Sequence, residues 1–101
     1  MILYNVTIKI DNDIENEWLD WVKDNYIQRT LNTGLFYDYK LLRLLNVNDD
    51  DGITYAVQFF AKSLSLAENF LNNHAQEITN EHRLKFQNRH VAFMTLLESV
   101  D

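Results

Sequence analysis

The chain has 101 residues, of which 47% are hydrophobic and 24% charged, a balance that fits one globular domain and argues against disorder. Its formal net charge of −6 opposes binding to nucleic acid or to anionic membranes, because both depend on clustered Lys and Arg, so neither partner is expected. The absence of cysteine excludes disulfides and thiolate chemistry, and without a signal-like N-terminus or a membrane-spanning apolar run we expect a cytoplasmic protein.

The first predicted element is a strand over residues 2–10. Every second residue is a large apolar side chain: Ile2, Tyr4, Val6, Ile8 and Ile10. The alternate positions hold Leu3, Asn5, Thr7 and Lys9. Because alternate residues of a strand point to opposite faces, the pattern predicts a strand with one apolar face toward the core.

A helix is predicted from about residue 12 to Leu31. Asn12, followed three residues later by Glu15, resembles a capping box, which marks a helix N-terminus. An apolar stripe at spacings of three and four follows: Ile14, Trp18, Trp21, Val22 and Tyr26. We expect the helix to loosen near Asn25 and to end at Asn32-Thr33-Gly34 through a glycine C-cap.

Two strands joined by a polar turn form a predicted hairpin. The first, from about Phe36 to Val47, becomes apolar on both faces and carries Arg43 between leucines. The second, residues 53–61, is uncharged and rich in β-branched and aromatic residues, which predicts an interior strand covered on both sides. One of its faces holds Ile53, Tyr55, Val57, Phe59 and Ala61, and the other Thr54, Ala56, Gln58 and Phe60.

A long helical segment and a final strand complete the pattern. Ser65 with Glu68 forms a second capping box, and Ser63 is an alternative cap. The helical pattern is long enough that we expect a bend or break near Asn72-Asn73. The last strand, from about His90 to Leu97, is apolar on both sides.

The element order β-α-β-β-α-β predicts an α+β, ferredoxin-like fold, in which two helices cover one face of a four-stranded antiparallel sheet. The uncovered face would expose Leu41, Leu45, Ala56 and Phe60, with one apolar set from the last strand. Such a patch is larger than a monomer usually exposes. We therefore expect two copies to pack sheet against sheet as a dimeric α+β barrel.

Polar residues within these apolar strands are the candidates for ligand binding. Arg43 could clamp an anion, or instead form an ion pair at the dimer seam or reach solvent. Gln58 needs a partner, which a ligand, Arg43, Asn5 or its own symmetry mate could supply. If the faces fall as expected, a pocket between the sheets is lined by Asn5, Thr7, Tyr39, Arg43 and Gln58.

Tyr55 and His82 complete the set of predicted ligand-binding residues, and in an enzyme either of them would transfer the proton. No metal or cofactor is expected. His74 and His82 lie two helical turns apart, which is too far for one ion, and no third ligand accompanies His74 and Glu77. The acidic hairpin turn lacks the spacing of a calcium loop. His90 opens a strand and is expected to be exposed.

Four short segments carry a resemblance to a known family: Ile2-Leu3-Tyr4-Asn5-Val6-Thr7, Glu17-Trp18-Leu19-Asp20-Trp21, Thr33-Gly34-Leu35-Phe36 and Thr54-Tyr55-Ala56-Val57-Gln58-Phe59. Over essentially its whole length the chain resembles a small bacterial family of uncharacterised single-domain proteins, which implies no catalytic residue. More distantly, it is similar to dimeric α+β barrel proteins, including antibiotic-biosynthesis-type monooxygenases, stress-responsive barrel proteins and muconolactone isomerases. That similarity implies sheets paired face to face and a pocket between sheet and helices or inside the barrel.

RNA-recognition domains share the topology, but Asp51 stands where they carry a basic residue and Gln58 where they carry an aromatic one. Our leading hypothesis is a cytoplasmic homodimer that binds a small, partly apolar molecule between sheet and helices or in the barrel. One alternative is a cofactor-free monooxygenase or isomerase. Another is a purely structural dimerisation module.

Overall fold

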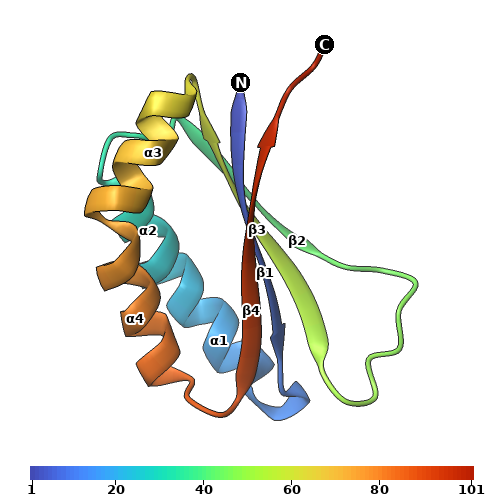
Figure 1. The fold of residues 1–101 in the computed structure, drawn as a ribbon. Helices are drawn as coiled ribbons and strands as arrows, with labels where there is room; N and C mark the ends of the chain where they lie inside the picture. The colour runs from blue at the N-terminus through green and yellow to red at the C-terminus, as the bar shows by residue number, and fades with distance from the viewer.

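Four antiparallel strands form the sheet of this computed structural model, which describes residues 1–101 (Figure 1). They are β1 (Ile2–Ile10), β2 (Asp38–Arg43), β3 (Ile53–Ala61) and β4 (His90–Glu98). Their spatial order is β2-β3-β1-β4, so the two strands with the cleanest alternation take the centre. All helices lie on one face of the sheet (Figure 1), which makes this the predicted ferredoxin-like fold. No helix is long and apolar enough to cross a membrane.

The first helical stretch changes its geometry part-way along. It comprises a 3-10 turn (Asn12–Ile14), α1 (Glu15–Trp21), the π-helical turn η2 (Val22–Tyr26) and α2 (Ile27–Leu31). The N–H of Ile27 bonds to the carbonyl of Val22, five residues back, which is the mark of a π turn. The extra residue lets the adjacent Tyr26 and Ile27 both remain buried. The predicted loosening near Asn25 is confirmed.

The second helical stretch is broken where the sequence predicted a break. It consists of α3 (Leu64–Asn73) and α4 (Ala75–Lys85). His74 separates them with φ −130° and ψ −32°, which is not a helical conformation. Because of this break, α3 and α4 are not collinear (Figure 1).

The three predicted helix ends have different outcomes. The N–H of Gly34 bonds to the carbonyl of Leu31 with φ +75° at the glycine, so the predicted C-cap is confirmed. Ser63 rather than Ser65 caps α3, since its hydroxyl accepts from a backbone N–H of the first turn. The capping role of Asn12 is wrong, because its side-chain amide donates to two carbonyls of the hairpin turn instead.

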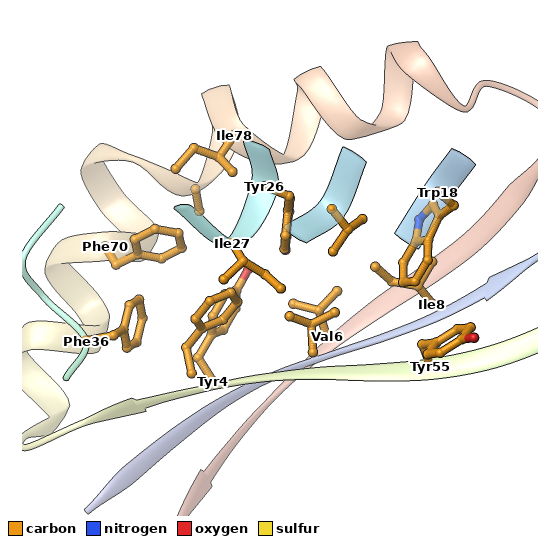
Figure 2. Packing of buried hydrophobic residues seen from close by; sticks show 14 of the residues in the cluster. Tyr4, Val6, Ile8, Trp18, Tyr26, Ile27, Phe36, Tyr55, Phe70 and Ile78 are labelled. Atoms are coloured by element: carbon orange, nitrogen blue, oxygen red, sulfur yellow. The ribbon is translucent and has the colours of Figure 1, made fainter. Parts of the chain in front are cut away.

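The hydrophobic core lies between the sheet and the helices. It contains the whole inner face of β1 and of β3, as the alternation predicted. Figure 2 shows Tyr4, Phe36 and Phe70 gathered at one end, and Trp18 beside Tyr55 at the other. The ring centroids of Trp18 and Tyr55 are 5.0 Å apart.

The faces of β2 differ from the prediction. Leu41 pairs with Val57, and Leu42 pairs with Ala56, so Leu41 lies on the helix side and Leu42 on the open side. β2 is also shorter than predicted, and Leu45 lies beyond its end with 72% of its surface exposed. The expected placement of Leu41 on the open face is therefore wrong, whereas Leu45 lines a hollow with Ala56 and Gln58 of that face. Because side chains alternate with period two, a one-residue error in hairpin register exchanges the faces.

The open face of the sheet is nevertheless largely apolar. Its apolar side chains are Leu3, Leu42, Leu44, Ala56, Phe60, Val91, Phe93 and Leu97. Phe93 is 64% exposed and Leu97 is 48% exposed. Ala56 and Phe60 lie on this face, as predicted. A polar row of Asn5, Thr7, Gln58 and Thr95 crosses its middle.

Candidate functional site

A groove runs between α4 and the edge strand β4. Its larger part has a volume of about 510 Å³ and is lined by Val6, Ile8, Tyr26, Thr79, His82, Arg83, Gln87, Asn88, His90, Val91 and Ala92. A second hollow of about 400 Å³ shares four of these residues, so the two are continuous. Met94 lies on the helix side of β4 and yet is 47% exposed, which shows that the helices leave this edge of the sheet uncovered. A groove of this size is enough for a small ligand.

His82, on α4, forms the inner wall of the groove. It is only 4% exposed, and its Nε2 accepts a 2.9 Å hydrogen bond from the indole N–H of Trp18. Since Nε2 accepts, the neutral ring must carry its proton on Nδ1. Burial, with a smaller contribution from His90, lowers the pKa of His82 to about 4. The ring is therefore uncharged at neutral pH.

His90, the first residue of β4, stands directly beside His82. The ring centroids are 4.7 Å apart and the rings are nearly perpendicular. The Nδ1–H of His90 donates to the carbonyl of Phe86 at 2.7 Å, because a carbonyl can only accept. Its Nε2 makes no hydrogen bond, and the half-buried ring lines the groove. His90 thus offers the groove one free lone pair, which can accept a hydrogen bond or a proton.

Two phenols form part of the groove floor. Burial raises the pKa of Tyr26 well above its usual value, and the neighbouring Tyr4 adds to the effect. Burial also raises the pKa of Tyr4, despite opposing hydrogen-bond contributions from Tyr26 and Thr79. Both phenols therefore keep their protons at neutral pH and act as hydrogen-bond donors, not as bases.

The residues predicted to bind a ligand do not form one cluster. Asn5 and Gln58 are opposite each other on the open face, where the Gln58 amide donates to Asn5 at 3.3 Å. Asn5 in turn donates to Thr7 at 3.1 Å. The predicted proximity of these three residues is confirmed. On the uncovered face, these side chains supply hydrogen-bond partners to one another.

Arg43 and Tyr39 lie on the opposite side of the sheet from Gln58. Tyr39 is opposite Phe59 near the sheet edge and is 38% exposed. Arg43 is opposite Tyr55, also on the helix side. Arg43 and Gln58 nevertheless line one hollow of about 300 Å³ together with Thr7 and Tyr55. Tyr39 is not part of it. The helix-side placement of Arg43 and Tyr39 again follows from the register of β2, which the sequence leaves open.

Arg43 and Tyr55 instead join an ion cluster at the end of the sheet. The Tyr55 hydroxyl donates to Glu15 at 2.6 Å, and Arg43 contacts Asp49 at 2.8 Å and Glu15 at 3.8 Å. Burial and the bond to Glu15 raise the pKa of Tyr55 to about 12. Both side chains are thus occupied by protein partners, and Tyr55 remains a neutral phenol.

Of the predicted site residues, only His82 lies in the groove, and its neighbour His90 was not among them. The expectation that His90 is exposed is wrong, since it is half-buried. The signal that could have found it is the short connection between α4 and β4. A tight turn must bring the first residue of the strand back against the last turns of the helix.

Comparison with known proteins places this geometry in a family. Residues 1–100 match the model of DUF4286, a domain of unknown function. The chain belongs to this family. No curated protein matches the chain.

Solved structures share the fold at low sequence identity. A dimeric ferredoxin-like protein from an uncultured marine organism is 10% identical with a TM-score of 0.75, over 99% of this chain and 95% of that chain. A putative antibiotic biosynthesis monooxygenase from Nitrosomonas europaea is 10% identical with a TM-score of 0.68, over the full length of both. SnoaB, a cofactor-independent oxygenase from Streptomyces nogalater, is 10% identical with a TM-score of 0.64, over 99% of this chain and 94% of that chain. At these identities the likeness shows the fold alone.

Proposed function

We propose that this member of the DUF4286 family is a cytoplasmic, single-domain homodimer that binds a small, partly apolar molecule in the groove between α4 and β4. The observation that carries the proposal is the groove itself, which combines an apolar floor with His90 and a few hydroxyl and amide groups. Ligand sites in proteins have this character, an apolar surface with a small number of orienting polar groups. We prefer this groove to the predicted pocket between the sheets because, at about 510 Å³, it is larger than the hollow of about 300 Å³ on the open face.

The open face supports the homodimer. The molecule measures 38 × 30 × 18 Å, so its broad face is larger than the roughly 800 Å² per partner that a stable interface buries. Phe93 and Leu97 are exposed on this face, and Leu42 lies at its other edge. A two-fold axis would pair this face with itself and bury the polar row against its own copy. The dimeric ferredoxin-like structure has the same fold, which supports a second copy of this chain, and not a different protein, as the partner on the open face.

Cofactor-free catalysis, as oxygenase or isomerase, is the second candidate, and the geometry moves its proton acceptor from His82 or Tyr55 to His90. The lone pair of His82 is taken by Trp18, and the hydroxyl of Tyr55 is bonded to Glu15. Nε2 of His90 is free and lies on the groove. The oxygenase and monooxygenase among the structures of this fold support the candidate at the level of fold only.

Filling the groove tests the binding proposal. Ala92 lines both hollows from the exposed edge strand, so Ala92→Trp should occupy the space without disturbing the core. Leu84→Trp, on the exposed surface of α4 away from the groove, is the matched control. With the neutral fluorescent probe N-phenyl-1-naphthylamine, A92W should weaken binding at least about tenfold and L84W should not. Equal affinities of all three proteins would contradict the proposal.

A further inference from the structure

The groove between α4 and β4 contains no carboxylate. None of the residues that line its two hollows is Asp or Glu. The chain as a whole has 15 acidic residues against nine Lys and Arg. The acidic residues of this chain therefore all lie outside the walls of the groove. A site from which negative charge is excluded favours a ligand that carries negative charge.

Arg83, on α4, is the one charged residue on the groove wall. The other three arginines, Arg29, Arg43 and Arg89, each form ion pairs with carboxylates. The sole hydrogen bond of Arg83 runs from Nε to the Asn80 amide oxygen at 3.5 Å. Both of its terminal nitrogens are unpaired. A guanidinium presents two parallel N–H donors that match a carboxylate.

The rest of the groove is suited to an apolar body. Val6 and Ile8 supply its floor from β1, and Ala92 supplies its outer wall from β4. His82 is uncharged there, because burial lowers its pKa to about 4. His90 adds a single acceptor, Nε2, which can bind a hydroxyl or amide hydrogen of the ligand.

We infer that the ligand of this groove is a small organic acid with a flat or aliphatic apolar body, whose carboxylate binds Arg83. One guanidinium balances one negative charge, so a monocarboxylate fits better than a phosphate dianion, which would leave a charge uncompensated. The inference rests on the proposal that the groove binds a ligand and adds the chemical class. Because Arg83 is exposed to solvent, it confers specificity while the apolar floor supplies most of the affinity.

Two probes of nearly equal shape separate charge from apolar binding. 1-Naphthylacetate carries a carboxylate, and 1-naphthylacetamide replaces it by a neutral amide. Their dissociation constants are measured by isothermal titration calorimetry on the full chain, for the wild type, Arg83→Gln and Arg29→Gln. Arg29→Gln changes the net charge equally but removes a guanidinium that pairs with Glu77 and Glu81 outside the groove.

The wild type should bind the acetate roughly tenfold more tightly than the acetamide, as expected for a hydrogen bond to a charged group. R83Q should bind both probes equally, and R29Q should retain the preference. Equal binding of both probes by the wild type, or an unchanged preference in R83Q, would overturn the carboxylate class while leaving groove binding in place. Binding of neither probe would overturn both the inference and the ligand-binding proposal.

Discussion

The indole N–H of Trp18 donates a 2.9 Å hydrogen bond to Nε2 of His82, and this bond ties α1 to α4 through the buried core. Both residues are almost fully buried, at 0% and 4% exposure. No other donor in the structure contacts that ring nitrogen. The bond therefore fixes the tautomer of His82 and the relative position of the two helices.

Replacement of Trp18 by Phe should destabilise the fold more than the same change at Trp21. W18F leaves Nε2 of His82 buried without a donor, which costs about 1–3 kcal/mol, in addition to the lost volume. Trp21 packs on His82 and Phe86 but makes no hydrogen bond to His82, so W21F should cost less. Urea unfolding measures the loss of unfolding free energy in each variant. Equal losses would show that the hydrogen bond adds nothing to stability.

Stability should fall as the pH drops from about 6.5 toward 4. The pKa of His82 is about 4 in the folded protein, below its ordinary value of 6.5, so between these values the unfolded chain binds more protons. At the lower end of this window the loss reaches about 3 kcal/mol. His82→Gln should flatten this part of the curve, and His74→Gln, on a half-buried ring at the helix break, should not. Identical slopes in the wild type and H82Q would rule out this role.

Gly52 should tolerate alanine far less well than Gly34. At Gly52, with φ +151°, an added Cβ would lie 2.9 Å from the carbonyl oxygen of Ile10 and 2.8 Å from Cε of Lys9. At Gly34, with φ +75°, nothing lies within 4 Å, so the cost is backbone strain alone, about 1 kcal/mol. G52A should therefore lose at least twice the unfolding free energy of G34A. A smaller loss for G52A would mean that the backbone at Ile10 and the side chain of Lys9 can move away from the added Cβ.

Charge on the open face should dissociate the proposed homodimer. Phe93→Lys puts an ammonium on the apolar face that the proposed dimer buries and should weaken association roughly a hundredfold. Leu84→Lys places the same charge on the outer surface of α4 and is the control. Sedimentation velocity at micromolar concentration distinguishes dimer from monomer. A monomeric wild type would contradict the homodimer, and a dimeric F93K would place the interface elsewhere.

The central strands and the helices could be predicted from the sequence because their patterns are local. β1 and β3 alternate over nine residues each, so the inner faces from Ile2 to Ile10 and from Ile53 to Ala61 follow from period two alone. Gly34 marked a helix end, and the polar pair Asn72-Asn73 marked the helix break. Each of these features depends on neighbouring residues.

The candidate site could not be predicted in the same way, because it depends on register and on distant contacts. Arg43 and Tyr39 were predicted on the open face, but their pairing with β3 places them on the helix side. The hairpin turn, and not the strand pattern, sets this register. The groove exists because the helices leave the helix side of β4 exposed at the sheet edge, which no periodicity reveals. His90 joins it through a turn, and Trp18 reaches His82 from a helix far away in the sequence.

The most direct test of ligand binding in the groove is a 15N–1H NMR titration of the protein with 1-naphthylacetate. The largest amide shifts should fall on α4 around Thr79 and Arg83 and on β4 from His90 to Ala92, and A92W should abolish them. Shifts confined to the open face, around Asn5 and Gln58, would contradict it and place the binding site between the sheets.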